Sequence, residues 1–157
     1  MTRENKRHER EAYGISYDRF ALTRLQRVLT RELGVSSVLE CPSHGAKAAG
    51  SLYSLGWARQ GCDVTLVNPD PGTLHYWDEL GLQDQLNVVQ TEDPAALPFE
   101  DNSFDLCFNF VTFTSLPDPD AWLDELRRVS RRYIMVVACN NFQLGYPLHR
   151  TLHALFN

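Results

Sequence analysis

The sequence predicts an α/β protein in which helices cover both faces of a doubly wound, mostly parallel sheet of about five strands. Short apolar stretches of strand length alternate along the chain with longer stretches whose apolar residues recur at helical spacing. The stretch from Phe104 to Val111 is almost entirely apolar, as expected for a strand that is buried on both faces. Strands that alternate with helices in this way pair in parallel through right-handed crossovers.

The expected elements account for most of the chain. In order they are a helix over 16–33, a strand over 35–40, a helix over 46–60, a strand over 62–67, a helix from 70 or 72 to about 82, a strand over 86–90, a loop over 91–103, a strand over 104–111, a helix from 121 to about 129 and a strand over 133–139. Gly34 stands where a helix C-cap favours glycine, and Pro71 stands in a first helical turn, where proline is tolerated. We expect a single domain over residues 1–157, with 1–15 as a flexible N-terminal segment and 140–157 as a tail that contains a short helix.

Composition and charge exclude several classes of protein. The net charge of −5 offers no overall positive field, so neither nucleic acid nor a membrane is expected as a partner. No apolar run approaches the ~20 residues of a membrane span. The four cysteines form no C-x-x-C pair and the charged start holds no signal peptide, so a reduced, cytoplasmic protein is expected. Cys41 and His44 have C-x-x-H spacing, but without a second cysteine pair no metal site is expected.

Polar and aromatic side chains follow the predicted strands at their carboxyl ends, where open α/β sheets bind ligands. They are Glu40, Asn68, Asp70, Glu92, Asp93, Asn109 and Phe110. A carboxylate after the second strand can accept hydrogen bonds from both hydroxyls of a ribose, and a polar group after the third can read the amine of a base. The set suits an adenosine rather than a triphosphate, because Ser51 and Leu52 follow Gly50 where a P-loop has lysine.

Three motifs later in the chain carry a family resemblance. They are Leu97-Pro-Phe-Glu-Asp-Asn-Ser-Phe-Asp-Leu106, Leu116-Pro-Asp-Pro119 and Leu123-Asp-Glu-Leu-Arg-Arg-Val129. In order and spacing they resemble the class I S-adenosylmethionine-dependent methyltransferases, and the similarity covers about 35–139. The resemblance implies a Rossmann-like fold, S-adenosylmethionine as cofactor and methyl transfer to a small molecule or another acceptor.

The resemblance also implies a set of cofactor-binding residues. These are Glu40, Cys41, Pro42, Ser43, His44, Gly45, Asn68, Asp70, Asp93, Asn109 and Phe110. The first six would hold the methionine end, Asn68 or alternatively Asp70 would contact the ribose, Asp93 would lie by the adenine amine, and the last two would line the floor beside the sulfonium. Methyl transfer relies mainly on alignment of the acceptor, so no catalytic residue is named.

Several residues depart from the family pattern. The first loop reads Glu40-Cys-Pro-Ser-His-Gly-Ala46 in place of acid-x-Gly-x-Gly-x-Gly. Pro42 removes an N–H and fixes φ, and His44 adds bulk where glycine would allow a close approach. Asn68 in place of an acid loses charge-assisted hydrogen bonding to the ribose, which is worth about 1 kcal/mol more than a neutral hydrogen bond. Ser130-Arg-Arg132 replaces the usual Lys-Pro-Gly-Gly turn.

The end of the chain and the variant loop leave alternatives open. The family fold continues with a hairpin of strands 6 and 7, for which the sequence has no segment, so the fifth strand is expected to be an edge. A homo- or hetero-oligomer contact, or the tail 140–157, is expected to cover it. A non-catalytic methyltransferase-like binding or assembly subunit is the alternative function, favoured by Pro42, His44 and Asn68.

Overall fold

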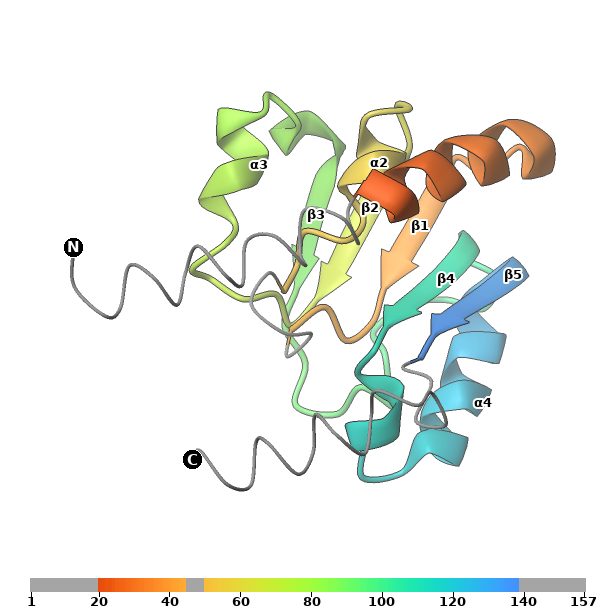
Figure 1. Ribbon diagram of the computed structural model, residues 1–157. Helices are drawn as coiled ribbons and strands as arrows, with labels where there is room; N and C mark the ends of the chain where they lie inside the picture. Colours follow the sequence, from red (N-terminus) through yellow and green to blue (C-terminus); the bar gives the residue numbers. More distant parts are fainter. Residues whose placement is uncertain (1–19, 45–49, 139–157) are drawn as a thin grey trace, which may run out of the picture.

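A computed structural model describes residues 20–44 and 50–138, and its centre is a five-stranded sheet (Figure 1). The strand order is β3-β2-β1-β4-β5, and all neighbouring strands are parallel. This architecture confirms the predicted fold class. The predicted segments 1–15 and 140–157, with Gly45 and Cys139, lie outside the described residues.

The described elements follow the predicted order. They are a helix over 20–33, β1 (Ser37–Glu40), α2 (Leu55–Ala58), β2 (Asp63–Val67), α3 (His75–Glu79), a 3₁₀ turn (Gln83–Gln85), β3 (Leu86–Val89), β4 (Phe104–Phe110), a second 3₁₀ turn (Phe113–Ser115), α4 (Pro119–Val129) and β5 (Ser130–Val137).

Helices cover both faces of the sheet (Figure 1). On one face, Trp57 of α2 and Trp77 of α3 join a core cluster with residues of β1, β2 and β4. On the other face, Trp122 and Leu126 of α4 pack with residues of the same strands. All of β4 is buried between these two layers, which explains its continuous apolar sequence.

The helix predicted over 46–60 is much shorter in its described part, where α2 begins only at Leu55. Ser51 has a left-handed backbone with φ of 65°, which a right-handed helix cannot contain. Its N–H donates to the carbonyl oxygen of Ser43 over 2.7 Å. The segment before α2 therefore folds back onto the loop after β1. Its apolar residues are buried, but they lie in a turn rather than on a helix.

Other element boundaries also differ from the prediction. α3 begins at His75, after a turn over 71–74, rather than at 70 or 72. α4 begins earlier than predicted because Oδ1 of Asp118 accepts the N–H of Ala121 over 2.9 Å and caps the helix. β5 begins at Ser130 rather than at 133, because Ser130 already pairs with Phe104.

A buried carboxylate holds the amino ends of β1, β4 and β5 together. Oδ2 of Asp105 accepts the N–H and hydroxyl of Ser36 over 3.0 and 2.8 Å, and Oδ1 lies 3.0 Å from Nη1 of Arg131. Burial acts to raise the pKa of Asp105, but the hydrogen bonds from Ser36 and Ser37 and the charge of Arg131 outweigh it, so the pKa is lowered. An ionised side chain thus aligns three strands.

β5 is an edge of the described sheet, as predicted, since it pairs there only with β4. Val136 on this strand exposes 38% of its surface. The free backbone groups of such an edge can pair with further chain. That a partner chain or residues 140–157 cover the edge stays a prediction. Within the described ranges, no helix is long and apolar enough to cross a membrane.

The helix over 20–33 packs against α2 at Gly56. A Cβ atom on Gly56 would lie 2.0 Å from Oε1 of Gln26 and 3.0 Å from Cα of Thr23. Gln26 is fully buried, and its Nε2 donates to the carbonyl oxygen of Tyr53 over 2.6 Å. The contact between the two helices therefore requires a residue without a side chain at this position.

We expect Gly56→Ala to lower the free energy of unfolding by about 1–3 kcal/mol, because the methyl group overpacks the helix contact. Alanine favours a helix over glycine by about 1 kcal/mol, so a gain in stability would contradict the contact. Urea denaturation followed by circular dichroism measures the change. Arg59→Ala, at the exposed end of α2, is the control and should have little effect.

Candidate functional site

The carboxyl ends of β1, β2, β3 and β4 meet at one edge of the sheet (Figure 1). All the predicted cofactor-binding residues that the structure describes lie at this edge or in the loops that leave it. Ligands of open α/β sheets bind at this edge. Gly45, the remaining predicted residue, lies outside the described residues.

The loop after β1 is buried, and its backbone is paired on both sides. The N–H of Cys41 donates to the carbonyl oxygen of Phe108 on β4 over 3.0 Å. The N–H and hydroxyl of Ser43 both donate to the carbonyl oxygen of Val67 on β2, over 2.8 and 3.0 Å. The N–H and hydroxyl of Ser51 donate to the carbonyl oxygen of Ser43, over 2.7 and 3.1 Å. We call Cys41–Ser43 with Ser51 the first-loop platform.

Cys41 and Pro42 are both buried in this platform and are joined by a cis peptide bond. Burial raises the pKa of the Cys41 thiol to about 12. A thiol with so high a pKa is not a nucleophile at neutral pH. The N–H of Cys41 is paired with Phe108 and its carbonyl oxygen with Asn109, so the predicted contact of its backbone with the cofactor stays a prediction.

Glu40 lies beneath the platform with only 1% of its surface exposed. Burial raises the pKa of its carboxyl to about 8, although hydrogen bonds from the hydroxyl and N–H of Ser54 act to lower it. The carboxyl therefore holds the N-terminal end of α2 against β1. Its predicted contact with the methionine end of the cofactor stays a prediction.

Asn68 links the loops after β1, β2 and β3. Its Nδ2 donates to the carbonyl oxygen of Thr91 over 2.9 Å, and the N–H of Thr91 donates to its Oδ1 over 2.8 Å. Nδ1 of His44 lies 2.9 Å from the carbonyl oxygen of Asn68. A carbonyl oxygen only accepts, so Nδ1 carries the proton, and in the neutral ring Nε2 is left as an acceptor.

Asp70 has an exposed side chain on a tightly held backbone. Its N–H donates to the hydroxyl of Ser51 over 2.7 Å, and its carbonyl oxygen accepts the hydroxyl of Thr73 over 3.0 Å. Its Oδ1 accepts the N–H of Gly72 over 2.9 Å. This leaves most of the acceptor capacity of the carboxylate directed to solvent at the end of β2.

Asp93 lies near the start of the long loop between β3 and β4. Its Oδ1 accepts the N–H of Ala95 over 2.8 Å, and its N–H donates to the hydroxyl of Thr91 over 3.2 Å. The side chain is exposed. Asp93 therefore shapes a turn through Oδ1, and its predicted contact with the adenine amine stays a prediction.

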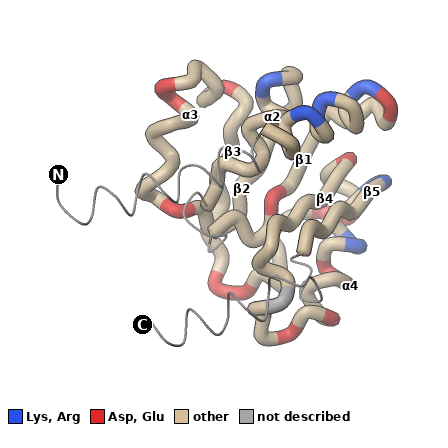
Figure 2. Tube along the Cα trace, viewed as in Figure 1, with Lys and Arg blue, Asp and Glu red and all other residues tan. Residues whose placement is uncertain are grey.

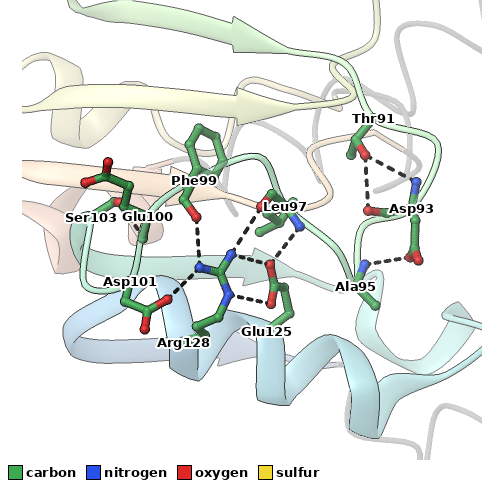
Figure 3. Close-up of polar contacts among 10 residues, drawn as sticks. All are labelled: Thr91, Asp93, Ala95, Leu97, Phe99, Glu100, Asp101, Ser103, Glu125 and Arg128. Atoms are coloured by element: carbon green, nitrogen blue, oxygen red, sulfur yellow. Dashed lines mark hydrogen bonds and ion pairs between the residues drawn. The ribbon is translucent and has the colours of Figure 1, made fainter.

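The same loop is held by a clasp from α4, formed by Glu125 and Arg128 (Figure 3). Oε1 of Glu125 accepts the N–H of Leu97 over 2.7 Å. Arg128 donates to the carbonyl oxygens of Leu97 and Phe99 over 3.1 and 2.8 Å. Arg128 also pairs with Glu125 and Asp101, both at 2.7 Å. The first and third of the motifs that carry the family resemblance thus meet in space and order the loop beside the site.

Asn109 and Phe110 form the floor at the end of β4. Nδ2 of Asn109 donates to the carbonyl oxygen of Cys41 over 3.0 Å and to the hydroxyl of Thr112 over 2.6 Å. Phe110 stacks on Tyr53 with ring centroids 3.9 Å apart. Val111 follows in a left-handed conformation with φ of 68°, which is strained for a β-branched residue. Asn109 is fully buried, so it positions the loop rather than meeting solvent.

Charge is distributed unevenly around the sheet (Figure 2). Asp70, Glu92 and Asp93 place carboxylates just beyond the ends of β2 and β3. Arginines, in contrast, lie on the helix over 20–33, whose blue segments in Figure 2 are away from this edge. A ligand that carries positive charge and hydroxyl groups is therefore the better match for the loops after β2 and β3.

Three residues that no sequence motif singles out also shape the site, namely Ser51, Ser54 and Thr91. Each acts through hydrogen bonds to distant parts of the chain. Such partners cannot be read from the sequence, because isolated serine and threonine residues form no hydrophobic periodicity or motif. The structure groups the predicted residues into buried ones that hold the loops, such as Ser43 and Asn109, and exposed ones such as Asp70.

Comparison with known proteins adds to this geometry. A family model described as "Methyltransferase domain" matches residues 48–133. A curated relative, sterol 24-C-methyltransferase ERG6B from Gibberella zeae, is 30% identical over 124 residues, which are 76% of this chain and 32% of the relative. The chain therefore spans about a third of the length of that relative.

Solved structures share the fold. A SAM-dependent methyltransferase from Aquifex aeolicus superposes with a TM-score of 0.58 at 22% identity, covering 75% of this chain and 65% of that one. The protein mmp1179 from Methanococcus maripaludis gives a TM-score of 0.60 at 19% identity, covering 90% of this chain and 66% of that one.

We expect Arg128→Lys to lower the melting temperature by a few degrees, because lysine cannot reproduce the forked contacts with Glu125 and the loop carbonyls. The matched control is Arg127→Lys, since Arg127 pairs with Asp124 where both side chains are largely exposed. Scanning fluorimetry compares the two variants. Equal melting temperatures would contradict a stabilising clasp.

The clasp also predicts a dependence of stability on pH. Hydrogen bonds from Arg128 lower the pKa of Glu125, so its contribution to stability is present above the unfolded value of about 4.3 and is lost as pH falls through the lower folded value. Glu125→Gln should therefore flatten the acid side of the stability profile. Urea unfolding between about pH 2 and 7 tests this. The exposed Glu79→Gln is the control, and an unchanged slope for Glu125→Gln would contradict the prediction.

Proposed function

Because the chain belongs to the class I, Rossmann-like methyltransferase family, we propose that it is an S-adenosylmethionine-dependent methyltransferase acting on a small molecule. The match of the methyltransferase model to residues 48–133 is the observation that carries the proposal. Family and fold imply S-adenosylmethionine binding, whereas a fold alone does not specify an activity. The sterol named for the curated relative supports a small-molecule acceptor. The free thiols of Cys41, Cys62 and Cys107 support a reducing, cytoplasmic location.

The residues of the site suit this cofactor. S-adenosylmethionine presents a ribose diol, an adenine amine, a methionine end and a positively charged sulfonium. Asp70 and Asp93 offer exposed carboxylates to the first two groups. The first-loop platform would hold the methionine end, with His44 exposed at its rim. The negative charge beyond β2 and β3 favours a cationic ligand.

The side chains of this protein would act by orientation and exclusion of water. When bound, S-adenosylmethionine supplies a methyl group that is already activated, so alignment is the main contribution of the protein. Asn109 holds the loop after β4 against Cys41. Phe110, stacked on Tyr53 and 8% exposed, keeps the floor apolar and dry.

A non-catalytic methyltransferase-like binding or assembly subunit is the second candidate. Two observations favour it. The carboxyl of Glu40 is buried against Ser54, and the amide of Asn68 is bonded to Thr91, so both polar groups are already engaged within the protein. In this case the activity would reside in a partner chain, and the β5 edge is the surface that a partner would cover.

Isothermal titration calorimetry with S-adenosylmethionine and S-adenosylhomocysteine tests the proposal. We expect saturable binding of both, because the platform and the carboxylates are already in place. ATP is the control ligand and should bind more weakly, because it lacks the methionine end and Ser51 stands where a P-loop has the lysine that holds phosphates. Absence of heat with both adenosyl compounds at millimolar concentration would contradict the enzyme proposal. A partner that becomes active only with this chain would support the second candidate.

A further inference from the structure

The helix over 20–33 has a buried side and an outward side of different chemistry. Gln26 is fully buried, so the side of the helix that it occupies packs on the rest of the protein. Residues three, four or seven positions apart share one side of a helix. Arg24, Arg27 and Arg31 have this spacing and are all exposed, and blue segments recur along the helix in Figure 2. The outward side is therefore basic.

The protein itself does not neutralise these arginines. Within residues 20–44 and 50–138, no ion pair joins any of the three to an acidic side chain, whereas Arg127, Arg128 and Arg131 each pair with an aspartate or a glutamate. Like charges three or four positions apart on a helix repel each other. The outward side thus carries an unbalanced positive charge, which favours an anionic partner.

Apolar side chains stand among the arginines. Phe20 exposes 69% of its surface and Val28 exposes 51%, the two largest fractions of any large apolar residue in the described part of the chain. They lie four positions before and four positions after Arg24, so they share its side of the helix. At an anionic bilayer, lipid phosphates attract arginine while apolar side chains enter the acyl boundary. Duplex DNA would neutralise the arginines but offers Phe20 and Val28 no apolar layer.

We propose that this outward face binds the surface of a membrane that contains anionic lipids. The face consists of Phe20, Arg24, Arg27, Val28 and Arg31. This inference differs from the expectation drawn from the net charge of −5, because the local charge of one face decides such a contact. The protein would lie on the bilayer through this helix rather than span it. The inference is independent of the proposed function, since it uses no residue of the candidate site.

Co-sedimentation of the full chain with lipid vesicles tests the proposal. We expect binding to vesicles of phosphatidylcholine with phosphatidylserine, a loss of affinity as salt is added, and much weaker binding to phosphatidylcholine alone. Arg27→Gln should lower the affinity about fivefold, and the triple variant Arg24→Gln/Arg27→Gln/Arg31→Gln should lower it roughly 100-fold. Arg127→Gln is the matched control and should have no effect, because Arg127 is an exposed arginine of α4, which covers the opposite face of the sheet.

Phe20→Ser separates a bilayer from other polyanions. It should lower the affinity for phosphatidylserine vesicles roughly tenfold and leave any binding to a DNA duplex unchanged. Melting temperatures should stay the same, because all the substituted side chains are exposed. Absence of binding to phosphatidylserine vesicles at low salt, or equal losses for Arg27→Gln and Arg127→Gln, would overturn the proposal. Tighter binding to the duplex than to vesicles, with Phe20→Ser affecting neither, would also overturn it and indicate a nucleic-acid partner.

Discussion

Burial of the loop after β1 is the constraint on which the rest of the site depends. This loop leaves a strand that lies between β2 and β4, and an unpaired polar group there would cost about 1–3 kcal/mol. Its backbone must therefore find partners. Ser43 donates to Val67 of β2, Ser51 donates to the carbonyl oxygen of Ser43, and Asn109 of β4 donates to that of Cys41. As a result, three loops at the carboxyl edge are locked to one another by the chain itself.

The strongest motifs in the sequence belong to this supporting framework rather than to the reacting groups. Leu97 and Phe99 lie in a loop without regular structure, and their carbonyl oxygens need donors from elsewhere. The fork of Arg128 supplies those donors, and Glu125 orients it and accepts the N–H of Leu97 (Figure 3). A family based on methyl transfer can be recognised through such a clasp, because the reaction asks for alignment more than for acid–base groups.

Two buried carboxyl groups on adjacent strands show how nearby hydrogen-bond donors and cations decide whether a carboxyl group is ionised. Asp105, at the amino edge, receives hydrogen bonds from Ser36 and Ser37 and faces Arg131, so its pKa is lowered. Glu40, at the carboxyl edge, is fully buried with Ser54 as its donor, so its pKa rises to about 8. The edge away from the site is therefore held by an ionised carboxylate, whereas burial beneath the first-loop platform disfavours the charged form of Glu40.

The sequence by itself determined the alternation of strands and helices, the parallel sheet and the family, because periodicity and short motifs are local properties. It placed the site residues at the strand ends, since parallel topology gathers those ends at one edge. Tertiary structure alone decided the left-handed turn at Ser51, the inclusion of Ser130 in β5 and the pairing of Asn68 with Thr91. Each depends on hydrogen bonds between segments far apart in the chain, and such partners leave no periodic trace in the sequence.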